Sequence, residues 1–506
     1  MSDSLNYIPS VATVCSKPVF STMTSRNQFC RLFHDALPIA TIGRLIGRSI
    51  GGLMLVLLAN CVFAQDSADQ KNWQANMQAI NSKIPTSFEI NEDLVNAAGI
   101  EKRIGKHIVL YTDVRQENIG ELVSIFDKAI TPWCQIFGVA PKRAENWQMR
   151  VFLIANSKDR TRFEKTGLIP EELPEFLAGY QRGPNIWLYL QPGEYYTRHL
   201  LIHEGTHAMM QWFLNGHGAP WYSEGMAELI GVHQWKDDSI KLKYRLRDRS
   251  QAPYWGRVKQ VKDDLKNGEA MTLAEVLRIE PRSFLKVRAY AWSWAACDFF
   301  TNHSRTKKMF PKMQKIASQQ PEIFNRKFVE QLKPHWDELE RDWALMVSEM
   351  EYGYAVESGQ ISNATASTTN DPKSPIANFS IQSNRSWQST NIKLKKGDRL
   401  RISGSGEFKV GQSGTANPQP WPCQSNGITI QYYRGHPLGM LHAAMLNLDG
   451  ETSMDQIAGL LDPLPIGISR EITVPSDGLL CLRINESPAK LDDNQDALEV
   501  RVEKLE

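Results

Sequence analysis

The spacing of apolar residues changes character along the chain. From about residue 65 to about residue 354, apolar residues recur mainly at helical spacing, with few segments of strand character. From about residue 375 onward, short alternating segments are broken by glycine and proline, which is typical of antiparallel strands. The pattern therefore predicts an α+β domain over residues 65–356 and an all-β sandwich or jelly-roll domain over residues 376–506.

The segment between these two parts, residues 357–375, consists mainly of small and polar side chains. Such a composition cannot bury a core, so we predict a linker there. In the first part, apolar runs bounded by turn residues predict strands over residues 108–111, 149–154 and 185–190. A helix is expected over about residues 197–213, where apolar positions are interrupted by two histidines and a glutamate.

Residues 1–64 have the pattern of an export leader. Arg44 and Arg48 precede an apolar run that ends in Val62-Phe63-Ala64, which predicts export to the periplasm, cell surface or medium after signal-peptide cleavage following Ala64. A transmembrane helix is the alternative, but this run of about 14 residues is shorter than the roughly 20 that span a bilayer.

The leader leaves two further alternatives open. The segment Leu58–Cys61 resembles a lipoprotein cleavage box, with Asn60 where a small residue is expected, so membrane contact through a lipid remains a second prediction. The long stretch before Arg44, with an internal Met23, is either an extended leader or a mis-assigned start.

Composition and charge narrow the class of partner. The chain has 506 residues, 42% of them hydrophobic, which is ample for real cores. Lysine and arginine number 58 against 56 acidic residues, and a net charge of +2 without a basic run argues against nucleic acid as a partner.

Four of the seven cysteines lie after the leader, at positions 134, 297, 423 and 481. None is in a CxxC pair, which argues against a zinc site built from cysteine. Cys423 and Cys481 form either a disulfide, which an oxidising compartment would permit, or two buried thiols.

The predicted helix carries the motif His203-Glu204-Gly205-Thr206-His207. Residues four apart share one helix face, so both imidazoles can reach one tetrahedral zinc ion. Glu204, offset around the helix, then points at the open position where water binds, and is expected to be the catalytic base. Two ordinary core histidines are the alternative, but these polar groups in an apolar helix are costly unless paired or metal-bound.

A second segment supplies a third ligand. Trp221-Tyr222-Ser223-Glu224-Gly225-Met226-Ala227-Glu228 resembles the second motif of the gluzincin superfamily of zinc peptidases, in which a second helix provides a glutamate ligand. The resemblance implies that Glu224 binds zinc with His203 and His207. It also implies that Glu228 orients a zinc-bound imidazole.

His217 is the alternative third ligand. The metzincin family requires glycine and histidine at positions that Met210 and Phe213 occupy here, so that family is excluded. His217 then remains either a residue that contacts substrate or a solvated loop histidine.

Two weaker features belong to the same resemblance. Residues 179–190 are placed as the edge strand that pairs with substrate in gluzincins, with an ordinary structural sheet as the alternative. Tyr290, in an aromatic-rich helix over residues 288–300, is placed as a catalytic donor to the oxyanion, with a core aromatic as the alternative.

The C-terminal part resembles the calcium-dependent galactose-binding lectin of the PA-I type, through Trp387, residues 396–400 and residues 482–486 and 492–494. The resemblance implies that Glu486, Asp493 and Asn494 bind Ca²⁺ together with a glycan. Lys490 and Asp496 depart from the pattern, standing where an oxygen donor and a glycine are expected.

Together these features predict an exported zinc metallopeptidase that hydrolyses a peptide or protein substrate. The zinc domain is expected to be zincin-like, and the lectin-like domain to localise the enzyme or shape access to it. A non-catalytic cell-surface or glycan-binding protein with a structural zinc site is the alternative.

Overall fold

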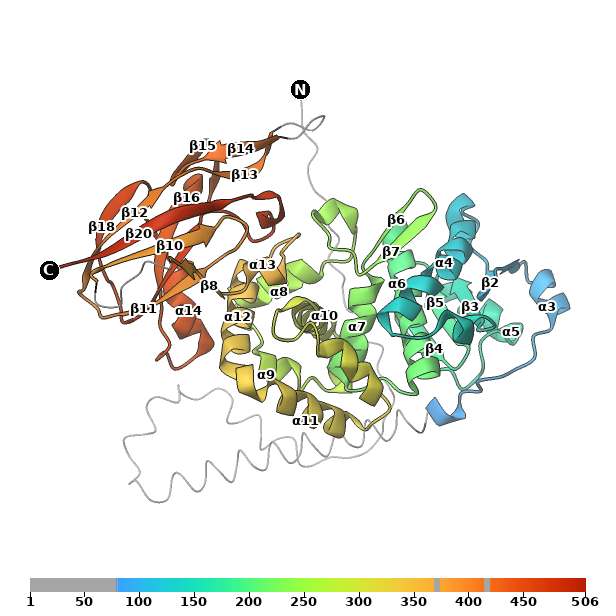
Figure 1. Cartoon of the computed structure of the whole chain (residues 1–506). Helices are drawn as coiled ribbons and strands as arrows, with labels where there is room; N and C mark the ends of the chain where they lie inside the picture. Colours follow the sequence, from blue (N-terminus) through green and yellow to red (C-terminus); the bar gives the residue numbers. More distant parts are fainter. Residues whose placement is uncertain (1–78, 80, 368–373, 414–418) are drawn as a thin grey trace, which may run out of the picture. The chain divides into compact units, whose positions relative to one another are not determined.

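The computed structural model describes residue 79 and residues 81–367, 374–413 and 419–506 (Figure 1). The predicted leader, residues 1–64, lies outside the described residues. Every described residue belongs to one unit, Trp73–Glu506. Within this part of the chain, none of the helices has the length and apolar character needed to cross a membrane.

A five-stranded mixed sheet forms the first layer, in the order β1-β2-β3-β5-β4. The inner pairs β2/β3 and β3/β5 are parallel, and the outer pairs β1/β2 and β4/β5 are antiparallel. The three predicted strands are confirmed as β2, β3 and β5. The strands are β1 (Glu101–Ile104), β2 (Ile108–Thr112), β3 (Met149–Ile154), β4 (Gly179–Arg182) and β5 (Asn185–Tyr189).

Alternate side chains of these strands enter two separate cores. One face, with Leu110, Val151 and Leu188, packs in the large core with helices α4 (Glu121–Ile136) and α6 (Glu194–Met209). The opposite face, with Phe152 and Trp187, packs with residues of α3 (Glu92–Ala97) and α5 (Arg160–Lys165). The sheet therefore supports α6 from one side.

Further helices complete the first part, gathered around α10 (Figure 1). A π-helical turn, Met210–Leu214, continues α6, so the predicted helix is confirmed with a change of type near its end. A short hairpin, β6 (His233–Lys236) and β7 (Ser239–Leu242), follows α7. The helices are α7 (Pro220–Gly231), α8 (Arg257–Lys266), α9 (Leu273–Val276), α10 (Val287–Asn302), α11 (Pro321–Leu332), α12 (Trp336–Glu349) and α13 (Val356–Gly359).

The C-terminal region is rich in β-structure, as predicted. One sheet has the order β18-β12-β20-β10-β9 and the other β15-β16-β19-β11-β8, with β17 paired to β16 and β13 to β14. Apolar side chains from both sheets share one core. The strands are β8 (Ser362–Asn363), β9 (Thr365–Ala366), β10 (Ile376–Gln382), β11 (Gln388–Leu394), β12 (Arg399–Ser405), β13 (Phe408–Ser413), β14 (Gln419–Cys423), β15 (Asn426–Tyr433), β16 (His436–Leu446), β17 (Leu464–Pro465), β18 (Ser469–Thr473), β19 (Gly478–Ile484) and β20 (Ala497–Leu505).

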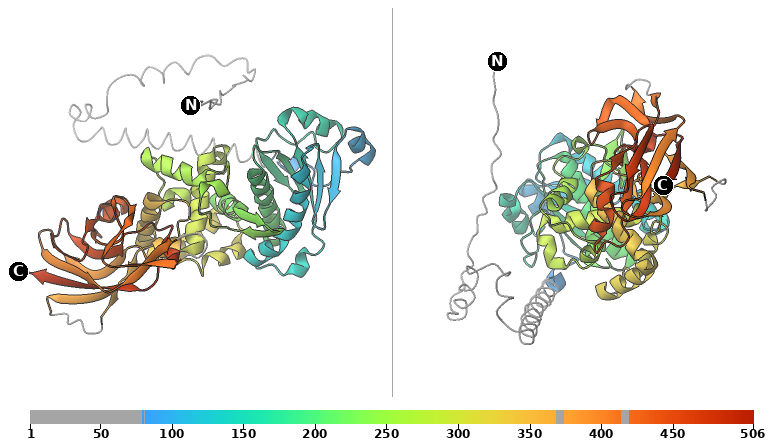
Figure 2. Two further views of the ribbon diagram at one scale, coloured as in Figure 1. Left: turned by 90° about the horizontal axis from the view of Figure 1, so that it is seen from above. Right: turned by 90° about the vertical axis from the view of Figure 1, so that its left-hand side faces the viewer.

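Helix α14 (Ser453–Leu461), which the alternating pattern did not predict, packs on β16. In Figure 2 it is the orange-red helix beside the C-terminal strands. Part of the predicted linker is also ordered: it contains most of α13, and β8 and β9 pair with β11 and β10. The pairing uses backbone groups, which need no apolar pattern. Cys423 and Cys481 are free, buried thiols, so they do not form the disulfide that was one of the two alternatives.

Candidate metal centre

Helix α6 carries two histidines and a glutamate toward its buried side. His203 and Glu204 are buried, and His207 is partly buried. A close contact with α4 fixes the helix, because a Cβ on Gly205 would lie 2.6 Å from the Trp133 ring. The predicted motif thus stands on a rigid, internal helix rather than on a surface loop.

Helix α7 brings Glu224 to these histidines. The helix begins with Pro220, whose fixed φ favours a first helical residue. On its other side, a Cβ on Gly225 would lie 2.3 Å from the carbonyl oxygen of Ser293 in α10. Since α7 is packed against both α6 and α10, the position of Glu224 is determined by close helix contacts.

Three side-chain atoms of this helix pair form a nearly equilateral triangle. Nε2 of His203 and Nε2 of His207 are 3.2 Å apart, and each lies 3.3 Å from Oε2 of Glu224. Ligands about 2.0 Å from a tetrahedral zinc ion are separated by about 3.3 Å, from simple tetrahedral geometry. The three atoms therefore fit one zinc ion and leave a fourth position for water.

The remaining ring nitrogens each face a polar side chain of α7. Nδ1 of His207 lies 3.2 Å from the Ser223 hydroxyl, and Nδ1 of His203 lies 3.5 Å from Oε1 of Glu228. Partners on Nδ1 favour the tautomer that leaves Nε2 free for a metal ion. Burial raises the pKa of Glu224, but the two histidines outweigh burial and hold that pKa well below its usual range.

Glu228 is held by a buried arginine. Arg257 donates to both carboxylate oxygens, Nε to Oε2 at 3.0 Å and Nη2 to Oε1 at 2.9 Å, and Trp255 donates to Oε2 at 3.2 Å. Burial opposes ionisation of Glu228, but Arg257 and then His199 outweigh it and keep the pKa well below its usual range. Glu228 is therefore a buried anion with a strong cationic partner.

Within the described residues, two groups of histidine and glutamate could hold a metal ion, and they share His203. The second group consists of His199, His203 and Glu228. Because Arg257 already binds both Glu228 oxygens, a second cation there would face like charge. The group His203, His207 and Glu224 is the better metal site.

Glu204 is 7% exposed, and its carboxylate makes no hydrogen bond or ion pair with the side chain of any other described residue. Burial raises its pKa to about 7, against a lowering effect of His207 and in the same direction as Glu224. A bound metal cation would favour the ionised form. A buried, unpaired carboxylate whose pKa is close to neutral pH is suited to accept and release a proton.

The edge strand β4 passes directly over Glu204. A Cβ on Gly179 would lie 2.6 Å from the carboxylate oxygen Oε1 of Glu204. Strand β4 pairs only with β5 in this sheet, so its other edge is free within the described residues. Residues 179–190, predicted as one edge strand, thus form two strands; β5 is internal, and β4 alone lies at the edge, beside the candidate base.

Tyr290 and His217 both lie near the histidine pair. The Tyr290 ring is 6.0 Å from the His203 ring, and burial, then Glu224 and Glu204, raise its pKa far above its usual range, so the phenol stays protonated. The His217 ring is 5.8 Å from the His207 ring, and its Nε2 lies 2.8 Å from the Gln211 side-chain oxygen. Burial and His207 lower the pKa of His217 to about 4.

Two of the predicted calcium ligands, Glu486 and Asn494, are hydrogen-bonded to each other. The Asn494 amide nitrogen donates to Glu486 Oε2 at 2.8 Å and to the Ser383 carbonyl at 2.9 Å, and its oxygen accepts from Gly411. The atom that faces the Glu486 carboxylate is thus a donor, where calcium requires oxygen ligands. Burial raises the pKa of Glu486 to about 7. Glycan binding at this loop stays a prediction.

Several residues of the site carried no signal in the sequence. Arg257 and Trp255 lie in a segment without a recognisable motif, and Ser223 stands next to Glu224 but needs the fold to reach His207. Gly179 was part of the predicted edge strand, yet its contact with Glu204 follows only from tertiary packing.

Comparisons with known proteins add little to this geometry. No protein-family model and no curated protein matches the chain. One similar solved structure is the EclA N-terminal domain, described as a PllA-like lectin. It is 17% identical, with a TM-score of 0.18, and the match covers 25% of this chain and 95% of that chain. At this TM-score the likeness assigns no function to the chain.

Proposed function

We propose that this chain is a zinc-dependent hydrolase of peptide bonds, of the zincin-like, gluzincin type. The triangle of His203, His207 and Glu224 carries the proposal, because its edges of 3.2, 3.3 and 3.3 Å match the spacing of tetrahedral zinc ligands. Nitrogen and carboxylate ligands of this kind, with one position open to water, are typical of catalytic zinc sites.

Glu204 favours catalysis over a structural zinc site. A structural zinc has four protein ligands and no use for a further carboxylate. Here a buried glutamate without a hydrogen-bond partner among the described residues lies one residue from a ligand. Keeping such a group has an energetic cost that stability alone does not explain, whereas a proton acceptor needs it.

Bound zinc would supply Lewis-acid polarisation of a carbonyl group and a lower pKa for water. Glu204 accepts the proton of the attacking water and passes it to the nitrogen of the leaving amine. The protonated Tyr290 hydroxyl donates a hydrogen bond to the oxygen on which negative charge develops. The free edge of β4 pairs with the backbone of an extended peptide and aligns it beside Glu204.

Metal analysis combined with a quenched-fluorescence peptide library tests this proposal. We expect about one zinc per chain and cleavage of library peptides. Glu204→Gln should keep the zinc and lose cleavage, because the amide cannot accept the proton. Glu194→Gln, on the exposed side of the same helix, is the matched control and should cleave normally. Stoichiometric zinc with no cleavage of any peptide would instead support the structural-zinc alternative.

A further inference from the structure

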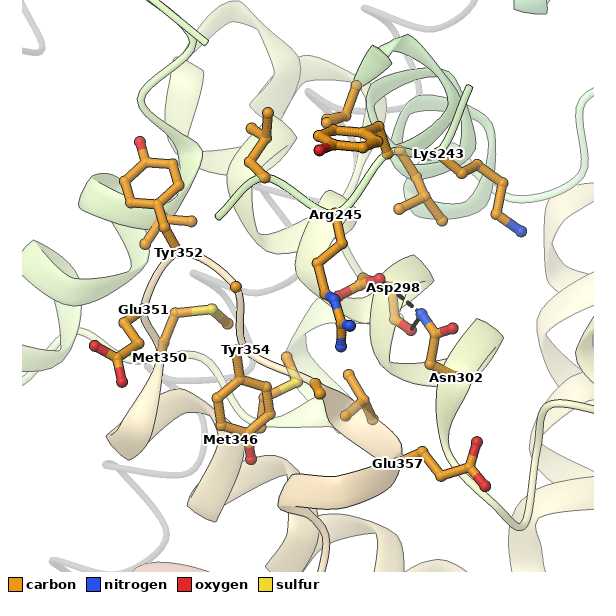
Figure 3. A pocket seen from close by; sticks show the side chains of 18 of the residues that line it. Lys243, Arg245, Asp298, Asn302, Met346, Met350, Glu351, Tyr352, Tyr354 and Glu357 are labelled. Atoms are coloured by element: carbon orange, nitrogen blue, oxygen red, sulfur yellow. Dashed lines mark hydrogen bonds between the residues drawn. The ribbon is translucent and has the colours of Figure 1, made fainter. Parts of the chain in front are cut away.

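A cavity of about 440 Å³ is lined by residues of α7, α10 and α12, none of which belongs to the metal triangle. Its walls come from the C-terminal part of α7, residues 243–246 after β7, α10, the end of α12 and residues 350–358 (Figure 3). A volume of this size suits a small organic molecule, since ligand pockets commonly measure about 300–1,000 Å³.

Two opposite charges line this cavity without pairing. Asp298 of α10 accepts from the Asn302 amide at 2.8 Å, and Lys243 stands at the end of β7. Both are partly buried, and among the described residues neither forms an ion pair. Arg245 extends into the cavity in Figure 3, but its charge is taken up by Asp492.

Burial shifts the pKa of both Asp298 and Lys243. Burial raises the pKa of Asp298 to about 6, against the lowering effect of Lys243 and Arg245. Burial likewise lowers the pKa of Lys243, against the effect of Asp298. At neutral pH Asp298 is therefore largely ionised in spite of its burial, and this desolvation is not offset by an ion pair.

The rest of the lining is mixed, with Glu351, Glu357 and Arg385 beside an apolar part. Trp294, Met346, Met350 and Tyr354 are buried and border the cavity. An acid and a base that were merely structural would be expected to close into one ion pair in such surroundings. Both line the cavity without forming an ion pair, so together with the apolar part of the wall they match a molecule that carries both charges and an apolar body.

We propose that this cavity binds a zwitterionic amino acid with a large apolar side chain. Its ammonium group binds Asp298, its carboxylate binds Lys243, and its side chain packs on Trp294 and the two methionines. The site is separate from the metal triangle and does not depend on the proposed peptidase activity.

Isothermal titration of the full-length protein with L-leucine tests the proposal, in buffer with EDTA so that no metal site can bind the ligand. We expect saturable binding of one molecule per chain. N-acetyl-leucine and leucine amide each lack one charge, and each should bind at least about tenfold more weakly, because a charge-assisted hydrogen bond is lost. This ligand series needs no change in the protein.

Two variants locate the site. Asp298→Asn and Lys243→Met should each weaken L-leucine binding at least about tenfold. Lys241→Met, at an exposed position of β7, is the matched control and should bind like the wild type. The proposal is overturned if L-leucine, L-phenylalanine and L-methionine all fail to bind, or if affinity is the same in all three variants.

Discussion

The Arg257–Glu228 pair allows a stringent test of how His203, the histidine that faces Glu228, is held in place. Both side chains are nearly inaccessible, 5% and 2% exposed, and two parallel hydrogen bonds of 3.0 and 2.9 Å join them. Arg257→Met keeps much of the side-chain volume and removes the charge. Breaking a buried pair by removing one partner costs about 3–5 kcal/mol, since an uncompensated charge remains. We expect a loss of that size in the free energy of unfolding.

The loss should depend on pH in a defined direction. In the wild type the pKa of Glu228 is below its unfolded value, so its contribution is fully present above about pH 4.3 and lost as pH falls through the folded value. In Arg257→Met, burial should raise that pKa above the unfolded value. The variant then loses stability as pH rises from about 4.3. The difference in the free energy of unfolding between the wild type and the variant therefore widens from pH 4 to pH 7.

Urea unfolding of the metal-free proteins, followed by tryptophan fluorescence at several pH values, measures this gap. Arg305→Met is the control, because Arg305 and Glu338 form an exposed pair and such pairs contribute about 0–1 kcal/mol. Zinc affinity should also fall about 10–100-fold in Arg257→Met, as for other residues that support a metal ligand. A gap below about 1 kcal/mol that does not change with pH would refute the reasoning.

Three further predictions concern the substrate side and export. Tyr290→Phe should lower kcat about 10²–10³-fold, the usual effect of removing an oxyanion donor, with zinc content unchanged; a fall below threefold contradicts the assigned role. Gly179→Ala should displace the Glu204 carboxylate, since the added Cβ would lie 2.6 Å from it, so peptide cleavage drops while zinc affinity stays. Mass spectrometry of the exported protein should give Gln65 as the first residue, and an intact leader would contradict cleavage after Ala64.

The sequence was informative where function depends on local geometry. His203, Glu204 and His207 share one helix, so their spacing alone predicts where their side chains meet. Glu224 lies on another helix and was placed only by resemblance. Neither spacing nor resemblance could identify Arg257. It contacts Glu228, which is distant in the sequence, and the segment around Arg257 contains no recognisable motif.

The same distinction holds for the fold. β2, β3 and β5 are buried strands, so the apolar runs in their sequences predicted them. The sequence predicts a linker where the structure has β8, a two-residue strand of Ser362 and Asn363 that pairs through its backbone with β11. Backbone hydrogen bonds leave no trace in side-chain composition, so such strands need the tertiary structure to be recognised.

The contacts of the C-terminal region change how its predicted ligand loop should be understood. Arg245 and Arg247 bind Asp492, Arg247 also donates to the Ala489 carbonyl, and Ser487 bonds Glu351. The loop that was predicted to hold calcium is thus engaged with the helical part along much of its length. Nearby, the buried Glu349 of α12 accepts from Arg483 at 2.9 Å. Such contacts favour a role for this region in supporting the cavity and the helices beside it.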